Sequence, residues 1–194
     1  MQCYQEAIQI NPNYDKAWNN KGLLLCNFKK YQEAIKCYEM AISINLNNDN
    51  AWNNKGQVLK ILNNNIEAIV CFDQIILHNP NNYKAWNDKG LGLFNLNQYQ
   101  EAIKCFDKAI SINQKYDDAW NNKGLTLKKL KQYKDAISCY DEALSISINP
   151  IRLRGKADSL FEIGMKSEAK QFYLAALEQG SNESNYIKKQ LSKI

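Results

Sequence analysis

Histidine, proline, arginine and glycine are scarce in this chain of 194 residues, which has 1 His, 3 Pro and 8 Gly and whose arginines are Arg152 and Arg154. A single histidine excludes most histidine-based metal centres and catalytic triads. So few turn-forming residues argue against an all-β protein, because such a chain needs a turn signal every few residues. No apolar run approaches the roughly 18 residues that cross a bilayer, so no membrane segment is expected. Glu6 stands where the apolar core of a signal peptide would lie.

Charge of neither sign dominates the sequence. Lys and Arg number 25 against 20 Asp and Glu, which gives a net charge of +5. This excess is well below what binding of nucleic acid by charge alone requires. Hydrophobic residues make up 45% of the chain and aromatic residues 11%. This content is typical of a folded domain and argues against general disorder.

A period of 34 residues organises the chain. It is clearest in the four tryptophans, which are Trp18, Trp52, Trp86 and Trp120. A glycine follows four residues after each tryptophan, an alanine sixteen residues after it and an aromatic residue twenty residues after it. Each unit predicts two amphipathic helices, and an Asn-, Pro- and Asp-rich turn separates successive units. Mid-helix glycine costs about 1 kcal/mol relative to alanine, so we expect these glycines where two helices approach closely.

Apolar residues at helical spacing define the face that each helix should bury. In the first complete unit, Trp18, Leu25 and Phe28 are expected to form the buried face of the first helix. Six cysteines are present without a Cys-x2-Cys pair, and five of them follow the same period. Equivalent residues of stacked units lie about 10 Å or more apart, since helices pack at about 8–10 Å, and this is beyond the ~7 Å between Cα atoms that a disulfide allows. We therefore expect buried packing thiols in a reducing, cytoplasmic compartment, with no metal and no cofactor.

The pattern resembles the tetratricopeptide repeat, a 34-residue helix–turn–helix unit with the signature Trp-x2-Leu-Gly-x2-Tyr followed by Ala-x3-Phe. Trp18, Gly22, Ala34 and Tyr38 match it in the first complete unit. Lysine holds the usual leucine position in four units, beginning with Lys21. The resemblance implies an all-α fold, a right-handed α-solenoid of stacked antiparallel helix pairs with a C-terminal capping helix.

The period also predicts how the chain is divided. Residues 1–14 match only the second helix of a unit, which suggests a solenoid cut from a longer chain. Complete units are expected at 15–48, 49–82, 83–116 and 117–149, followed by a degenerate unit at 150–182 and a capping helix at 183–194. A capping helix with a polar outer face is typical of the end of a solenoid.

Members of the tetratricopeptide family bind extended peptides on a concave surface lined by their first helices. Transferred position by position, the resemblance implies that twelve residues of this chain bind peptide. They are Asn19, Asn20, Leu23, Asn53, Asn54, Lys60, Asn87, Asp88, Phe94, Asn121, Asn122 and Lys128. Among them, Asn20, Asn54, Asp88 and Asn122 would form one column. A carboxamide can pair with both the N–H and the C=O of a peptide backbone. The column is similar to the asparagine ladder in the tetratricopeptide superhelix of O-linked N-acetylglucosamine transferase, although Asp88 interrupts it.

We therefore expect a protein–protein interaction scaffold with no enzymatic activity, since no phosphate-binding loop, nucleophile elbow or carboxylate pair stands out. Lys60 and Lys128 favour a partner of acidic character. Three alternatives remain open at this point: a substrate-recruiting arm of a larger enzyme, an RNA-binding array, and self-association through the ends of the solenoid. The RNA alternative is disfavoured by the period of 34 residues and by the modest charge.

Overall fold

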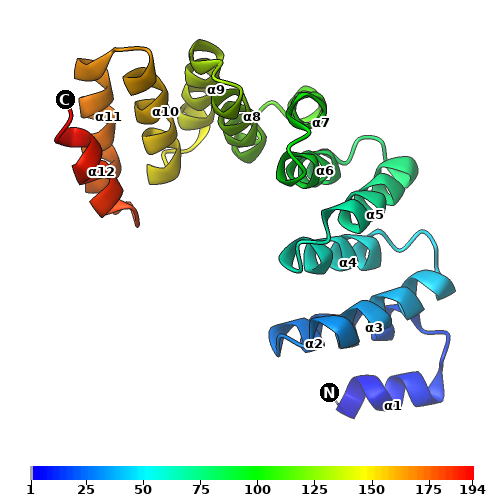
Figure 1. Cartoon of the computed structure of the whole chain (residues 1–194). Helices are drawn as coiled ribbons and strands as arrows, with labels where there is room; N and C mark the ends of the chain where they lie inside the picture. The colour runs from blue at the N-terminus through cyan, green and yellow to red at the C-terminus, as the bar shows by residue number, and fades with distance from the viewer. Residues whose placement is uncertain (1) are drawn as a thin grey trace. The chain divides into compact units, whose positions relative to one another are not determined.

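A computed structural model describes residues 2–194 of the chain, and throughout this range all regular secondary structure is helical (Figure 1). The helices are α1 (Gln2–Ile10), α2 (Asp15–Asn27), α3 (Tyr31–Ile44), α4 (Asp49–Ile61), α5 (Asn65–His78), α6 (Tyr83–Asn95), α7 (Tyr99–Ile112), α8 (Asp117–Lys129), α9 (Tyr133–Ile146), α10 (Pro150–Glu162), α11 (Lys166–Glu178) and α12 (Ser184–Leu191). The predicted all-α helical repeat is confirmed.

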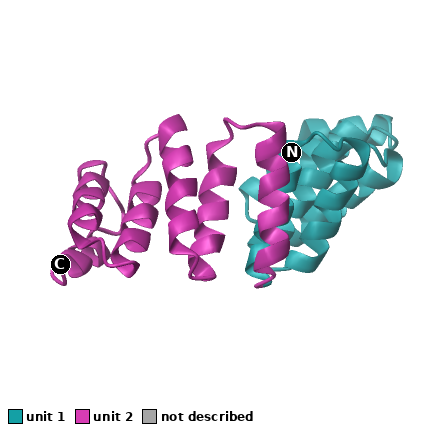
Figure 2. Ribbon diagram, turned by 90° about the horizontal axis from the view of Figure 1, so that it is seen from above, with its two compact units in different colours: residues 1–96 teal, residues 97–194 magenta. Residues whose placement is uncertain are grey.

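The helices gather into two compact units, one reaching to Leu96 and the other spanning Asn97–Ile194 (Figure 2). In the first unit, α2 packs on α3 and α4 packs on α5, while α3 also packs on α4 and α5 on α6. In the second unit, the same pattern joins α7 to α8, α8 to α9, α9 to α10, and α10 to α11, with α12 against α11. Within each unit, successive helices therefore pack one on the next, so that the second helix of a repeat also contacts the first helix of the following repeat.

Local side-chain chemistry explains where several first helices begin. The side-chain oxygens of Asn48 and Asn82 accept hydrogen bonds from the backbone N–H groups of Ala51 and Ala85, at 3.0 and 3.1 Å. Asn149 caps α10 in a similar way. These bonds satisfy N–H groups that have no partner inside the helix. The Asn-rich turns between repeats are thus the start signals of the helices that follow.

The turn within each repeat contains one residue with positive φ, two positions before the second helix begins, and this residue helps to reverse the chain between the two helices. These residues are Lys29, Asn63, Asn97, Lys131 and Gly164. Phe28 departs from its predicted place at such a turn. It lies beyond the end of α2 and is exposed. Because the chain leaves the helix at this point, the phenyl ring cannot join the buried face that Trp18 and Leu25 were expected to share with it.

The recurring tryptophans tie each first helix to the turn before it. In every case the indole N–H donates to the backbone carbonyl six residues earlier, over 2.8–3.0 Å. The carbonyls belong to Pro12, Leu46, Pro80 and Gln114. A buried or half-buried indole needs such an acceptor for its N–H. This bond gives the period of 34 residues a structural reason at its most regular position.

Glycine recurs because an aromatic ring from the second helix of the same repeat occupies the space beside it. A Cβ added to Gly22 would lie 2.5 Å from Cε1 of Tyr38, and one added to Gly56 would lie 2.8 Å from the ring of Phe72. The rings of Tyr38 and Phe72 are fully buried. The predicted close approach of two helices at these glycines is therefore confirmed.

The same glycine position in two repeats yields a prediction. At Gly124 an added Cβ would lie 3.2 Å from Tyr140, a milder contact than at Gly22. Alanine gains about 1 kcal/mol of helix propensity at either position, whereas overpacking a rigid core costs about 1–3 kcal/mol. We expect Gly22→Ala to lower the free energy of unfolding by about 2 kcal/mol and Gly124→Ala to change it little. Urea denaturation followed by circular dichroism measures both, and equal effects would contradict the ring-contact explanation.

Four of the five periodic cysteines are buried between helices, as expected: Cys37, Cys71, Cys105 and Cys139. The prediction is wrong for Cys3, which is exposed. The reason is that α1, the helix on which Cys3 lies, contributes no buried residue. None of the helices in residues 2–194 is long and apolar enough to cross a membrane.

Candidate functional site

The first helices of the repeats carry the residues predicted to bind peptide, and we call their shared side the first-helix face. In the first unit α2 contacts α4 directly. The Nδ2 group of Asn54 on α4 donates to Oδ1 of Asn19 on α2 at 2.9 Å. Asn19 in turn donates weakly to Oδ1 of Asn20, at 3.4 Å. The structure thus brings three of the predicted asparagines together across two repeats.

Burial divides these asparagines into two classes. Asn19 and Asn87 are only 8% and 4% exposed, so they belong to the packing between helices. Asn20, Asn53 and Asn54 are half-buried. Within the described residues, the amide N–H groups of Asn20 and the Oδ1 atom of Asn54 make no hydrogen bond. The predicted set therefore contains asparagines that are used in packing, whereas Asn20 and Asn54 keep hydrogen-bonding groups that are not used within the described residues.

A polar hollow of about 400 Å³ adjoins Asn20 at the start of α2 and α4. Asp15 organises its wall, because its Oδ2 atom accepts from the side chains of both Asn45 and Asn48 at 3.0 Å. The residues that line the hollow are Asp15, Lys16, Asn19, Asn20, Asn45, Asn47, Asn48, Asp49 and Asn50. Such a wall offers donors and acceptors on all sides, which suits an uncharged polar group such as a peptide unit.

Asp88 interrupts the asparagine column, and the preceding repeat compensates for its charge. Its two carboxylate oxygens accept from Gln57 at 2.8 Å and from Lys60 at 2.7 Å. The side chains of Lys60 and Asp88 are 17% and 15% exposed, so the ion pair is well shielded from water. The acid at position 88 therefore links α4 to α6.

A second shielded pair lies on the first-helix face of the other unit. Lys128 on α8 donates to Oδ2 of Asp158 on α10 at 2.8 Å. The hydroxyl groups of Tyr173 and Tyr186 donate to the other oxygen of Asp158, at 2.8 and 3.1 Å. Because Lys60 and Lys128 each face a carboxylate already, neither presents an unpaired positive charge to a ligand.

Sequence reasoning missed Asp158. A signal was present, because this residue occupies the position five after Leu153, where other repeats carry Leu23, Gln57 or Leu125. An acid that replaces an apolar residue or an amide in a regular repeat indicates a new partner. Here the partners are Lys128 and the two tyrosines.

The remaining predicted residues lie on the same face without joining the asparagine pair. Leu23 on α2 is exposed, and Phe94 on α6 is half-buried. Asn121 and Asn122 lie side by side on α8 in the second unit, where Asn121 donates to Asn122 at 3.3 Å. Exposed apolar side chains beside hydrogen-bonding groups are what side-chain selection in a peptide groove requires.

The lysines at the usual leucine position have a structural role. From the second complete repeat onward, each forms an ion pair with the second helix of the preceding repeat, whereas Lys21 lies over the ring of Trp18. The pairs are Lys55–Glu39, Lys89–Asp73, Lys123–Asp107 and Lys156–Asp141. Because the acid is always the residue after the buried aromatic, the pairs recur with the repeat. Each pair joins the second helix of one repeat to the first helix of the next. These lysines are consequently not candidates for ligand binding.

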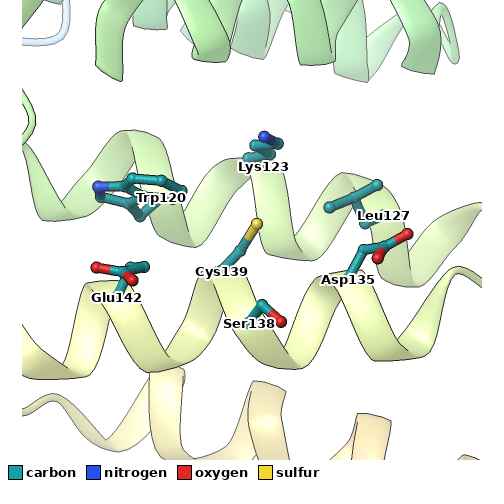
Figure 3. Close-up of a pocket in the computed structure, with 7 residues that line it drawn as sticks. All are labelled: Trp120, Lys123, Leu127, Asp135, Ser138, Cys139 and Glu142. Atoms are coloured by element: carbon teal, nitrogen blue, oxygen red, sulfur yellow. The ribbon is translucent and has the colours of Figure 1, made fainter. Parts of the chain in front are cut away.

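A hollow between α8 and α9 contains the Cys139 thiol, which points toward α8 (Figure 3). Burial raises the pKa of Cys139 to about 11, and burial raises the pKa of Cys71 equally, to about 11. Protonated thiols are poor nucleophiles and poor metal ligands. The equivalent positions of the first complete repeat, from Trp18 to Met40, line a similar hollow. The feature therefore belongs to repeat packing.

The next candidates are groups of side chains that could bind a metal ion, and the histidine His78. Among residues 2–194, no group of three His, Cys, Asp or Glu side chains is placed to bind a metal ion. His78 ends α5, and its Nδ1 atom lies 2.9 Å from Oδ1 of Asp49 at the start of α4. This contact joins two neighbouring helices, as a structural histidine would.

Several solved structures are similar to this chain. PilW, a widely conserved type IV pilus biogenesis factor, has a TM-score of 0.82 and 18% identity, over 98% of this chain and 86% of that one. YrrB, a TPR protein with an unusual peptide-binding site, has a TM-score of 0.76 and 16% identity, over 98% of each chain. MamA has a TM-score of 0.77 and 20% identity, over 89% of this chain and 94% of that one. Likeness at these identities shows the fold alone.

A search of curated proteins found no match to the sequence. Family models, in contrast, match four successive segments. Tetratricopeptide repeat models match residues 15–48, 83–116 and 117–149, and a second tetratricopeptide repeat model matches residues 49–82. These segments make up more than half of the chain and coincide with the helix pairs α2–α3, α4–α5, α6–α7 and α8–α9. The chain therefore belongs to the tetratricopeptide repeat family, whose members generally serve as protein–protein interaction modules.

Proposed function

We propose that this chain is a non-enzymatic interaction module that binds an extended segment of a partner protein along its first-helix face. Asn20 and Asn54 would pair with the backbone of that segment, and Leu23 would contact its side chains. The observation that carries the proposal is the 2.9 Å bond between Asn54 and Asn19. This bond joins neighbouring repeats and holds the half-buried carboxamide of Asn54, while the weaker 3.4 Å bond from Asn19 restrains Asn20.

The unused hydrogen-bonding groups support backbone recognition. Asn20 has amide donors to offer and Asn54 has an acceptor, and an extended peptide presents an N–H and a C=O at each residue. Preorganised side chains lose little entropy on binding, which strengthens association without enlarging the contact area. A peptide-binding site in a protein of the same fold, YrrB, is consistent with this use of the architecture.

Other features of the predicted partner stay predictions. The acidic character inferred from Lys60 and Lys128 has lost its main support, because both lysines already face carboxylates. Contributions of Asn122 and Lys128 in the second unit, self-association, RNA binding, and service as the recruiting arm of an enzyme are likewise untested. Two of these alternatives give distinct results in the experiment below, since RNA binding weakens steeply with salt and self-association changes the molecular mass.

The proposal is tested with a peptide selected from a random displayed library against the full chain. Fluorescence anisotropy then compares the dissociation constants of the wild-type chain and the Asn20→Ala/Asn54→Ala variant. Each hydrogen bond contributes about 1 kcal/mol, so the loss of two should weaken binding by roughly tenfold or more. A peptide N-methylated at alternate residues should lose affinity for the wild-type chain as well, because methylation removes backbone N–H donors.

A matched control replaces two exposed asparagines away from this face, Asn13→Ala and Asn182→Ala, and should bind like the wild type. Far-UV circular dichroism establishes that all variants are equally helical. Equal affinity of the Asn20/Asn54 variant and the wild type would reject backbone recognition by these two residues. Binding that survives N-methylation would reject it independently.

A further inference from the structure

The second helix of one repeat, α5, carries an apolar stripe on its outer surface. Ile66, Val70 and Leu77 are 68%, 51% and 72% exposed. Their spacing of four and seven residues places them on one side of the helix. The buried side of α5 lies opposite and is formed by residues such as Ala68, Phe72 and Ile75. α5 is thus apolar on two sides, a pattern typical of a helix covered on both.

The other repeats show that the fold does not require this stripe. In the equivalent helices α3, α7 and α9, position 66 is occupied by Gln or Lys, position 70 by Lys or Ser, and position 77 by Ser. The equivalent residues are Gln32, Lys36 and Ser43 on α3, Gln100, Lys104 and Ser111 on α7, and Lys134, Ser138 and Ser145 on α9. All of them are exposed. Three apolar substitutions on one face of one repeat therefore need a reason outside the packing of the repeat.

The surroundings of the stripe extend it. A hollow of about 430 Å³ lies between α3, α4 and α5. Ile35, Leu59 and Leu62 are its apolar lining, and Leu62 and Ile66 are both exposed and only four residues apart. We call the stripe and this lining together the α5 patch. Contiguous apolar surface of this kind marks sites of association more often than scattered apolar residues do.

Charge around the patch is acidic on the α5 side. α5 contains Glu67 and Asp73 but neither Lys nor Arg, whereas α3, α7 and α9 each contain lysine. Asp73 pairs with Lys89 of α6 at 2.6 Å. Glu67 lines the α5 side of the hollow and forms no ion pair within the described residues, and Lys36 and Glu39 line its α3 side. The loss of lysine at position 70 thus removes a positive charge as well as adding an apolar side chain.

We propose that the α5 patch docks an amphipathic helix of a partner protein, with an apolar stripe flanked by Lys or Arg. The apolar stripe of the partner lies along Ile66, Val70 and Leu77, and a basic flanking residue pairs with Glu67. Helices recognised in this manner present apolar anchors at intervals of three, four and seven residues. This site is separate from the first-helix face, and the proposal does not depend on peptide binding there.

Charge argues against two other occupants. A second copy of the chain in a two-fold contact would bring the Glu67 carboxylates of both copies into one apolar interface, and like charges across an interface are unfavourable. An anionic lipid surface attracts helices rich in Lys and Arg, and α5 has neither. A basic amphipathic helix is the occupant whose charge complements the patch.

The test uses two helical peptides as long as α5, with identical leucine stripes and with either lysine or glutamate on both flanks. The full chain is compared with the variant Ile66→Gln/Val70→Lys/Leu77→Ser, which carries the residues that α7 has at these positions. We expect the lysine-flanked peptide to bind the wild type at least about tenfold more tightly than the glutamate-flanked one, with the difference falling as salt is added. The variant should bind about 1,000-fold more weakly, or roughly tenfold for each of the three apolar side chains lost.

Because α7 folds with these same residues, the stripe variant is expected to keep its helicity and thermal midpoint. The Asn20→Ala/Asn54→Ala variant should bind the lysine-flanked peptide like the wild type, since the two sites are separate. Equal affinity of the wild type and the variant for that peptide would overturn the proposal. So would a concentration-dependent dimer, measured by light scattering, that the variant abolishes, since the occupant would then be a second copy. Sedimentation with phosphatidylcholine–phosphatidylserine vesicles that depends on the stripe would also overturn it, in favour of a lipid surface.

Discussion

Replacing Asp158 with alanine is expected to lower the free energy of unfolding by about 3 kcal/mol. Asp158 is 9% exposed, and its carboxylate accepts hydrogen bonds from Lys128, Tyr173 and Tyr186. Its removal leaves the hydroxyl group of Tyr173 buried without an acceptor and leaves the Lys128 ammonium without its counter-charge. Breaking a buried pair from one side is costly for this reason.

Two further variants separate the contributions at Asp158. Asp158→Asn retains an oxygen for the tyrosine hydroxyls but loses the ion pair, so we expect a smaller loss, of about 1–2 kcal/mol. Tyr173→Phe should cost about 1 kcal/mol, since it removes one hydrogen bond and leaves the other two. Chemical denaturation followed by circular dichroism ranks the three. If Asp158→Ala were no more destabilising than Tyr173→Phe, the carboxylate could not be the centre of this network.

Arg152→Ala is expected to have an effect of similar size, about 3 kcal/mol. Arg152 is 5% exposed and lies on α10 at the position that alanine occupies in the four preceding repeats. Its guanidinium group pairs with Asp117 at 2.7 Å and with Asp118 at 3.0 Å, and it also donates to the carbonyl of Ser147 at 2.9 Å. Truncation therefore removes a planar group that links α10 to the start of α8.

Lysine at this position provides the control. Arg152→Lys preserves the charge, but one ammonium group cannot reproduce the fork that bonds two carboxylates and a carbonyl. We expect it to lose about 1–2 kcal/mol. Thermal denaturation in low and high salt measures both variants. A lysine variant as stable as the wild type would show that net charge, and not guanidinium geometry, stabilises this junction.

The period of the sequence predicted the helices because the four repeats from 15 to 149 satisfy the same local rules. Asparagine or aspartate at the start of the first helix, glycine beside a ring, and tryptophan at a constant position each have one local cause, repeated along the chain. The sequence pattern predicts burial less well at positions where no local rule fixes whether a side chain is covered. Cys3 follows the period, yet it is exposed because α1 buries none of its residues. Phe28 follows the apolar spacing of α2, yet it lies past the end of the helix.

The candidate site was predictable only in part. The resemblance indicated which face carries the asparagines, but it assigned Asn19 and Asn54 the same role. The structure distinguishes them, because Asn19 is buried and accepts from Asn54, whereas Asn54 remains half-exposed. From the sequence, Lys60 was expected to offer a positive charge to a ligand, whereas in the structure it is bonded to Asp88. Both differences come from contacts between repeats, which the sequence of one repeat does not contain.

Sequence alone was enough to establish the all-α repeat and its family, because helix period, turn signals and the 34-residue spacing are local and recur. Tertiary structure was needed to show which polar groups are already paired. A lysine and an acid 28 residues apart, as in Lys60 and Asp88, meet only after the repeats stack. Stacking likewise leaves Ile66, Val70 and Leu77 uncovered, since it buries the opposite side of α5. Which residues remain available to a partner is therefore a property of packing between repeats.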